Sequence, residues 1–318
     1  MRRFTSTPAP LTLSFLDGHR VPEPELVVGV LGATSFVGNR LFAREFTQIS
    51  DRDYSWIAFS RNLQKLTDEE TGRVHWCMLN DNPLAADKQK IEYWICLAPI
   101  WVLPEYFPLL KSRGARRIVA LSSTSRFTKE HSIDLTEQKL ANRLADGEHQ
   151  LISWAEQHQI EWIIVRTTMI YGWGRDQNIT MISRFIQRFG FVPLLGKAEG
   201  LRQPIHVDDV AQFCHLALFK KNITNKAYNI SGGESLSYKK MVERIFTTLG
   251  IKPFFFHLPL MFFRIIITFL HIFPRFKKVS VGMAKRMNQD LTFSNKDVKR
   301  DFEFEPRGFE LSKDDVGK

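Results

Sequence analysis

The sequence predicts an α/β fold, with a doubly wound parallel sheet and a smaller lobe in the C-terminal half of the chain. Two observations lead to this prediction. Short apolar runs alternate with longer stretches that have helical spacing, and the first of these runs ends in a glycine-rich turn. Strands separated by helices need crossover connections, which build a parallel sheet covered on both faces. A chain of 318 residues with 44% hydrophobic side chains can fill such a core.

The predicted strands are short apolar runs bounded by polar or turn residues. In chain order they are LVVGVLG at 26–32, SWIAFS at 55–60, RVHWCML at 73–79, YWICLA at 93–98, RRIVALSS at 116–123 and IEWIIVR at 160–166. Helical spacing follows the first run, in FVGNRLFAREF, and precedes the last, in LANRLADGEHQL at 140–151. After about residue 170 this regular alternation weakens, which favours a smaller lobe over the strand ends.

Charge and cysteine content select no partner and no metal. The net charge of +10 would suit anionic partners, but the lysines and arginines are spread along the whole chain, and no motif indicates specific binding of nucleic acid. Cys77, Cys96 and Cys214 stand far apart, without a CxxC pair or a histidine cluster. We therefore expect no metal site and no disulfide framework, and a reducing cytoplasm fits best.

The segment 253–274, PFFFHLPLMFFRIIITFLHIFP, is almost entirely apolar. Four residues interrupt it: His257, Pro259, Arg264 and His271. A charge near the centre of a bilayer is costly, so we do not expect this segment to span a membrane. Two readings stay open: a buried helix of the smaller lobe, or a peripheral contact with a membrane or a protein, for which the basic residues at 275–278 are suited.

The loop GATSFVG, residues 32–38, lies between the first predicted strand and the first predicted helix. In this context Gly32 can form the tight turn, Gly38 lets the helix pack closely on the sheet, and the loop can receive the diphosphate of a dinucleotide. Ser35 stands where a glycine would allow the closest approach; its hydroxyl either bonds a phosphate or is simply tolerated. The predicted cofactor-binding residues of this Rossmann-like arrangement are Gly32, Thr34, Ser35, Phe36, Val37, Gly38, Leu97 and Ala98.

Ser60 and Arg61 end the second predicted strand, where an acidic residue usually holds the ribose of NAD. No acid stands there, and an arginine suits the 2′-phosphate of NADP. The sequence therefore favours NADP over NAD, unless Arg61 is an ordinary solvated side chain. We expect an N-terminal extension at 1–25, a dinucleotide-binding domain at 26–175, and mainly a substrate lobe at 176–318, with some of its segments returning to the first domain.

Five later stretches make the chain resemble the extended short-chain dehydrogenase/reductase family, also called the NAD-dependent epimerase/dehydratase family. They are VALSSTS (119–125), IIVRTTMIYGWG (163–174), GLRQPIHVDDVA (200–211), KAYNISGGESLSYKKMV (226–242) and RMNQDLTFSNKDVKRDFEFEP (286–306). The resemblance runs from about residue 27 to about 306. Thr167 departs from it, since a proline is usual there, and so does one extra residue between Arg286 and Asp290.

The resemblance implies roles for several residues. Ser123, with Thr124 as the near alternative, would hydrogen-bond the reacting hydroxyl of the substrate, and Tyr171 would lie at the substrate. Arg202 and Arg286 would contact the diphosphate of a nucleotide-diphosphate sugar or another phosphorylated substrate, as guanidinium groups suit phosphate oxygens. The alternative is that Arg202 anchors its loop and Arg286 pairs with an acid of the smaller lobe. A homodimer is also an expectation from the resemblance.

The family's proton relay, Tyr-x-x-x-Lys, is missing from the sequence. When the chain is aligned on Glu148 and Arg166, the pair falls on Leu140 and Leu144, and no tyrosine occurs between Tyr106 and Tyr171. The neighbouring cations Lys139 and Arg143 are expected to point away from the leucine face. Other groups that could transfer a proton are Ser123, Tyr171, Asp146, Glu148 and His206.

Two hypotheses about function follow from the missing relay. The first is an NADP- or NAD-dependent oxidoreductase or epimerase with a substituted relay. The second is a non-catalytic NADPH-binding scaffold or regulatory protein, which could act at a membrane surface.

Overall fold

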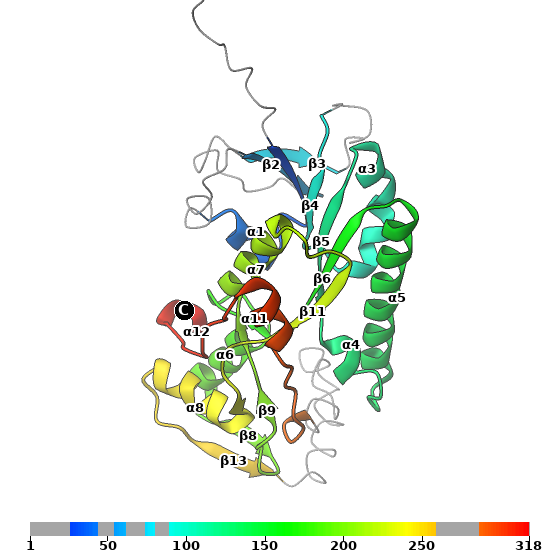
Figure 1. The fold of residues 1–318 in the computed structure, drawn as a ribbon. Helices are drawn as coiled ribbons and strands as arrows, with labels where there is room; N and C mark the ends of the chain where they lie inside the picture. The colour runs from blue at the N-terminus through cyan, green and yellow to red at the C-terminus, as the bar shows by residue number, and fades with distance from the viewer. Residues whose placement is uncertain (1–25, 44–53, 62–73, 80–88, 259–285, 318) are drawn as a thin grey trace, which may run out of the picture.

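The structure is a computed structural model that describes residues 26–43, 54–61, 74–79, 89–258 and 286–317 (Figure 1). The predicted N-terminal extension lies outside the described residues, as does 259–274, the larger part of the predicted apolar segment. The described chain forms an upper part built around a large sheet and a smaller lobe below it in the view of Figure 1.

Seven parallel strands form the large sheet. They are β1 (Leu26–Leu31), β2 (Tyr54–Ser60), β3 (Val74–Met78), β4 (Tyr93–Cys96), β5 (Arg117–Ser123), β6 (Glu161–Thr167) and β11 (Lys226–Ile230). Their order is β11-β6-β5-β4-β1-β2-β3, so the winding direction reverses between β1 and β4. Open parallel sheets bind ligands at this point, beyond the carboxyl ends of the strands. The predicted doubly wound α/β fold is confirmed.

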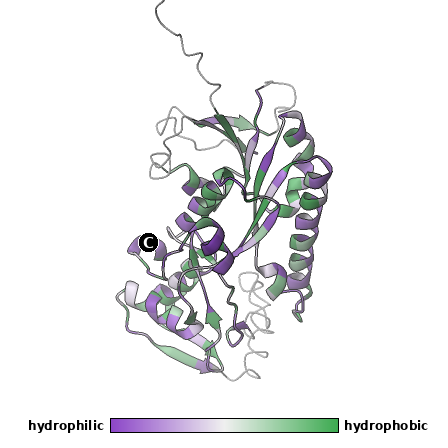
Figure 2. Cartoon of the chain, viewed as in Figure 1, coloured by the Kyte–Doolittle hydropathy of each residue, from purple (hydrophilic) through white to green (hydrophobic). Residues whose placement is uncertain are grey.

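The two faces of the sheet bury separate hydrophobic clusters, because successive side chains of a strand point to opposite faces. On β1, Val28 and Val30 join one cluster, and Val27 and Leu31 join the other. The first face is covered by α1 (Phe36–Leu41), α7 (Val207–Phe219) and α11 (Lys296–Phe302), and the second by η1 (Ile100–Tyr106), α3 (Phe107–Ser112) and α5 (Leu135–Gln157). Hydrophobic and hydrophilic residues alternate along α5, as an amphipathic helix requires (Figure 2).

The smaller lobe has a hydrophobic cluster of its own, which includes Ile186, Leu194, Val242 and Phe246. It contains α6 (Ile179–Phe189), α8 (Tyr238–Thr248), α12 (Lys313–Val316), β8 (Val192–Leu195) and β13 (Phe255–Leu258). The remaining elements of the described chain are the short helix α4 (Ser125–Thr128) and four two-residue strands: β7 (Ile170–Tyr171), β9 (Leu201–Arg202), β10 (Ile205–His206) and β12 (Leu236–Ser237). Strand β11 and helices α7 and α11 come late in the chain but belong to the sheet.

Helix α5 is held in place at both its start and its middle. The Asp134 side chain accepts a hydrogen bond of 2.9 Å from the N–H of Thr136, which caps the first turn. In the middle, Gly147 lies so close to η1 that a Cβ atom would come within 2.8 Å of the Trp101 nitrogen. The glycine thus allows α5 to pack directly on the segment that follows β4, which fixes the helix beside the ligand end of the sheet.

An aromatic cluster joins β2 to α7 on the first face of the sheet. The Tyr54 ring lies 5.2 Å from the ring of Trp56 and 5.3 Å from that of Phe219, measured between centroids. The Tyr54 hydroxyl is 2.6 Å from Nε2 of His215. Burial lowers the pKa of His215 to about 4, because a charged ring is disfavoured where water is excluded.

The lowered pKa of His215 predicts a pH dependence of stability. Between its ordinary value of 6.5 and about 4, the unfolded chain binds a proton that the folded chain does not, so the free energy of unfolding falls as the pH falls. Urea unfolding at about pH 7 and about pH 5 should show a loss of about 1–2 kcal/mol that His215→Phe reduces. The exposed His131→Gln is the control; equal pH dependence in wild type and His215→Phe would contradict this assignment.

Candidate functional site

The glycine loop lies at the point where the winding of the sheet reverses. Gly32 follows β1 with a φ of +76°, and a Cβ atom there would come within 2.4 Å of the Ala98 nitrogen, beyond the end of β4. At Gly38, a Cβ atom would come within 2.3 Å of the Ala33 carbonyl oxygen. Both positions therefore require glycine, and the backbone of the loop stays bare of side chains where a diphosphate could approach.

Ser35 caps the helix that follows the loop. Its φ of −67° and ψ of 168° are accessible to any residue, so a glycine is not required by the backbone at this position. The Ser35 hydroxyl accepts a hydrogen bond of 3.1 Å from the N–H of Gly38. One of the N–H groups at the start of α1 is thus already bound by the chain, and a phosphate at this loop would meet the serine hydroxyl beside it.

The other predicted cofactor residues surround the loop. Thr34 Oγ1 lies 3.3 Å from Ser60 Oγ, which joins the loop to the end of β2, and Arg61 follows as an exposed side chain. Val37 and Leu97 are buried in the first hydrophobic cluster, and Phe36 packs partly buried against it. Their side chains support the loop, and Arg61 is the charged side chain that the structure leaves at the surface beside it.

Ser123 is the last residue of β5, and Thr124 follows it directly. Thr124 is buried, and its hydroxyl donates a hydrogen bond of 3.0 Å to the carbonyl of Thr167 at the end of β6. Ser123 is half-buried, and its hydroxyl oxygen accepts a hydrogen bond of 3.1 Å from the N–H of Ser125. The Thr124 proton is used to join two strands, whereas the bond to Ser123 uses a lone pair and leaves its O–H able to donate.

Leu140 and Leu144 pack against the second face of the sheet. Leu144 is 4% exposed, and both side chains belong to the hydrophobic cluster that also contains Leu151. Among their neighbours on α5, Arg143 is exposed and places its guanidinium 4.3 Å from the centre of the Trp101 ring, and Lys139 is exposed. At these two positions α5 therefore presents apolar side chains to the sheet.

Glu148, one helical turn further along α5, forms the centre of a buried ionic cluster. Its side chain has no exposed surface. It accepts hydrogen bonds from the Ser122 hydroxyl at 2.6 Å, from Arg166 at 2.6 and 3.0 Å, and from Arg126. A carboxylate without solvent requires such partners, and two guanidinium groups leave the cluster with a net positive charge. The sequence offered Glu148 as a proton-transfer group; these contacts give it an anchoring role.

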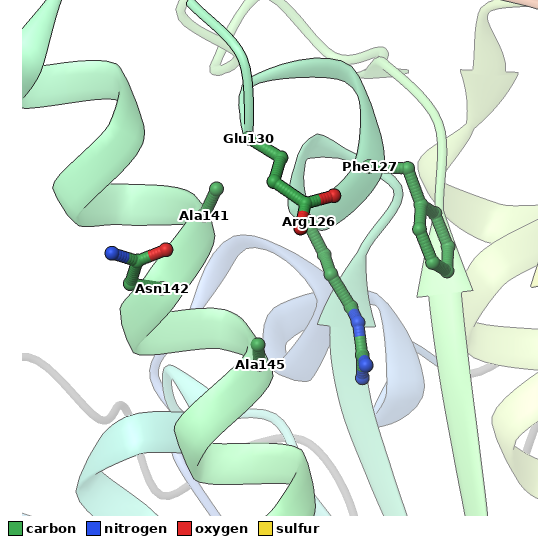
Figure 3. A pocket seen from close by; sticks show the side chains of 6 residues that line it. All are labelled: Arg126, Phe127, Glu130, Ala141, Asn142 and Ala145. Atoms are coloured by element: carbon green, nitrogen blue, oxygen red, sulfur yellow. The ribbon is translucent and has the colours of Figure 1, made fainter.

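Arg126 belongs to the site but was not predicted from the sequence. It lines a pocket of about 110 Å³ together with Phe127, Glu130, Ala141, Asn142 and Ala145 (Figure 3). The pocket lies between α4 and α5, and Arg126 extends through it toward Glu148. The available signal was a cation three residues after Ser123, but the sequence does not reveal that its partner lies 22 residues later on α5.

Arg202 and Arg286 are both bound within the chain. Arg202 is buried and donates to the carbonyls of Leu201 at 2.7 Å, Gln289 at 2.8 Å and Arg286, and burial lowers its pKa to about 10. Arg286 forms an ion pair with Glu137 in the first turn of α5. Arg202 thus anchors its loop, which was one of the two roles that the sequence left open for it. The acidic partner of Arg286 lies on α5, whereas the sequence placed that partner in the smaller lobe.

Charged groups of both signs gather around Glu137 at this first turn of α5. Burial by itself would raise the pKa of Glu137, but Arg286 and the Ser132 hydroxyl bring it below its ordinary value. The pKa of nearby Lys129 is lowered, first by burial and then by Arg286, while Glu137 opposes the shift. Asp134, which caps α5, opposes this shift as well, so two cations and two carboxylates lie together here.

Tyr171 and His206 lie in the interior and not at a surface. Tyr171 has no exposed surface, and its hydroxyl is 3.3 Å from the Glu310 carbonyl, so a substrate contact through its ring is not available in this structure. His206 is buried and caps α7, with Nδ1 accepting from the N–H of Asp208 and Nε2 3.2 Å from the Asp315 carboxylate. Packing between β10, α7 and the C-terminal segment accounts for both positions.

Within the described residues, no group of three or more His, Cys, Asp or Glu side chains is placed to hold a metal ion, and Cys96 and Cys214 are free thiols. In the same part of the chain, no helix has both the length and the apolar character needed to cross a membrane.

Comparison with known proteins agrees with this geometry. The model of the NAD dependent epimerase/dehydratase family matches residues 107–231, which include β5, α5, β6 and the positions of Ser123, Glu148 and Arg202. No curated protein matches the chain significantly in sequence. Residues 107–231 thus match the NAD dependent epimerase/dehydratase family, and they form part of the doubly wound sheet.

Three solved structures of similar fold have a nucleotide sugar in their names. UDP-glucuronic acid 4-epimerase from Bacillus cereus, in complex with NAD, is 18% identical, with a TM-score of 0.60 over 74% of this chain and 86% of that one. dTDP-glucose 4,6-dehydratase from Bacillus anthracis, also with NAD, is 15% identical, with a TM-score of 0.60 over 92% and 94%. MoeE5, in complex with UDP-glucuronic acid and NAD, is 18% identical, with a TM-score of 0.63 over 92% and 96%. At these identities the likeness concerns the fold.

Glu148→Gln tests the anchoring role of the buried carboxylate. The amide keeps the shape of the side chain but leaves Arg126 and Arg166 without a counter-charge, and the free energy of unfolding should fall by about 3–5 kcal/mol. Denaturant unfolding measures the difference. Glu156→Gln, which is exposed on the same helix, should change it by less than about 0.5 kcal/mol. If both variants are equally stable, the cluster does not depend on the charge of Glu148.

Proposed function

We propose that the chain binds NADP or NAD at the glycine loop and acts on a nucleotide-diphosphate sugar or a similarly phosphorylated substrate. One observation carries the proposal. Gly32 and Gly38 both lie against backbone atoms so closely that no Cβ atom fits, at the reversal point of a doubly wound sheet. A loop of this kind has room for the diphosphate of a dinucleotide, which supports a cofactor there.

In this proposal, residues at the ends of β1 and β2 hold different parts of the cofactor. Gly32, Gly38 and the Ser35 hydroxyl would hold the diphosphate, while Ser60 and Arg61 would face the adenosine ribose. When bound, the nicotinamide group supplies hydride transfer. NADP is the proposed preference because Arg61 is exposed beside the loop and no acid ends β2. The similar structures named above were obtained with NAD, so the preference depends on Arg61 alone.

The substrate class is supported by charge at the first turn of α5. Arg286 pairs with Glu137, and Lys129 lies near both Glu137 and Asp134, so an incoming phosphate oxygen would compete with these carboxylates for two cations. Arg286 would have to exchange Glu137 for that oxygen. The UDP-sugar names of the similar structures agree with such a substrate. Ser123, whose O–H is able to donate, would hydrogen-bond the reacting hydroxyl.

The apolar face of α5 favours a second candidate function. Leu140 and Leu144 cannot transfer a proton, and the buried contacts of His206 and Glu148 occupy two of the alternative groups. A non-catalytic, NADPH-binding scaffold would need only the glycine loop. The two candidates differ in turnover and agree in cofactor binding, so binding and turnover have to be measured separately.

Ser35→Asp tests the cofactor site. Aspartate caps a helix as well as serine does, so stability should change little, but its charge would repel a diphosphate and lower the affinity for NADP and NAD about tenfold or more. Nicotinamide fluorescence and thermal shift measure binding. Ser35→Gly should retain affinity, and Arg61→Ala should weaken NADP binding but not NAD binding. Equal binding by wild type and Ser35→Asp would place the cofactor elsewhere, and no binding by wild type would overturn the proposal.

Ser123→Ala tests the enzyme hypothesis against the scaffold. Incubated with cofactor and a panel that includes UDP-glucose and UDP-glucuronic acid, the wild type should convert at least one sugar, and the variant should do so about 100-fold more slowly. Chromatography of the nucleotide sugars detects the product. Ser153→Ala, exposed on α5, should match the wild type. Cofactor binding without turnover of any sugar would favour the scaffold.

A further inference from the structure

The smaller lobe exposes three phenylalanines, Phe189, Phe254 and Phe256. Their side chains are 47%, 61% and 52% exposed, respectively. Large aromatic side chains gain free energy when they leave water, so a group of exposed ones indicates contact with another body. The pairing of β8 with β13 and the end of α6 explain the positions of these three rings.

Strand pairing places these rings on one face. In the parallel pair of β8 and β13, Val192 stands beside Phe255 and Pro193 beside Phe256. Val192 is buried and Phe255 packs into the lobe's core, 5.7 Å from Phe246. Because side chains alternate along a strand, Phe254 and Phe256 point to the opposite, outer face.

Helix α6 adds to the same face at its C-terminal end. Phe189 is its last residue, and Gly190, with a φ of +74°, turns the chain into Phe191 and β8. The Phe189 ring lies 6.3 Å from that of Phe191 and 4.6 Å from that of Phe185. Phe191 directly precedes Val192, whose N–H donates a hydrogen bond of 3.0 Å to the carbonyl of Phe254, so the end of α6 leads straight into the strand pair. We call Phe189, Phe191, Phe254 and Phe256 the phenylalanine face.

The charges around the phenylalanine face are positive. Arg188 and Lys252 are exposed on the segments 181–195 and 251–258 that build it, and neither segment contains an aspartate or glutamate. The Arg188 guanidinium lies 5.5 Å from the centre of the Phe189 ring, at the border of the aromatic surface. Exposed aromatic rings bordered by cations suit a partner surface in which a layer of negatively charged groups covers an apolar interior.

We propose that the phenylalanine face docks on the surface of an anionic lipid bilayer. Its rings would enter the boundary between headgroups and acyl chains, and Arg188 and Lys252 would lie among the negative headgroups. This contact is peripheral and requires no spanning helix. It does not depend on the proposed cofactor or substrate, and it gives the open membrane reading of 253–274 a definite place at Phe254 and Phe256, without involving residues outside the described part.

Co-sedimentation of the full chain with vesicles tests the proposal. Wild type should bind phosphatidylcholine vesicles that contain phosphatidylserine, bind phosphatidylcholine alone less well, and lose affinity as salt is raised. The double variant Phe254→Ser/Phe256→Ser should bind about tenfold more weakly or worse. Arg188→Glu/Lys252→Glu should have a similar effect on the anionic vesicles only. Since all four side chains are exposed, thermal unfolding should change little.

Matched controls lie on the sheet part of the molecule. Ile133→Ser/Leu135→Ser removes two exposed apolar side chains at the start of α5, and Lys221→Glu reverses an exposed charge after α7. Both should bind vesicles as wild type does. The proposal is overturned if wild type ignores anionic vesicles or if the phenylalanine variant binds unchanged. It is also overturned if wild type dimerises without lipid and that variant is a monomer, because the face would then bind a second copy.

Discussion

The buried carboxylate of Glu148 determines how the ligand end of the sheet is assembled. It joins four elements, because Ser122 lies near the end of β5, Arg166 lies near the end of β6, Arg126 belongs to α4 and Glu148 itself lies on α5. A charge without solvent is tolerated only when its partners are complete, so each of these elements has one favourable position relative to the others. The orientation of α5, and with it the face that carries Leu140 and Leu144, follows from this constraint.

The same principle connects the smaller lobe to the sheet. The buried guanidinium of Arg202 binds three backbone carbonyls, two of them in the segment 286–289, and that segment in turn places Arg286 against Glu137 on α5. Arg202 thus holds the segment 286–289 that returns from the lobe, and Arg286 joins this segment to α5. Both arginines stabilise the fold in this structure, and a phosphorylated ligand would have to compete with these internal partners.

The site combines two kinds of surface. At the end of β1, Gly32 and Gly38 lie so close to backbone atoms that no Cβ atom fits, whereas on α5 Leu140 and Leu144 offer no group that transfers a proton. The first feature depends on main-chain geometry and the second on two side chains, so each can change without the other. Cofactor binding and proton transfer are therefore separate questions for this chain.

The sequence by itself determined the strands, the glycine loop and the lack of a Tyr-x-x-x-Lys pair, because these depend on local periodicity, on backbone conformation and on residue identity. The tertiary structure alone decided that Tyr171 is buried, that Arg286 pairs with Glu137, and that Phe254 and Phe256 face outward. Arg286 and Glu137 are 149 residues apart, and no local pattern indicates which distant charge will meet another. For Phe254 and Phe256, an unbroken aromatic run has no period, so only pairing with β8 could assign its two faces.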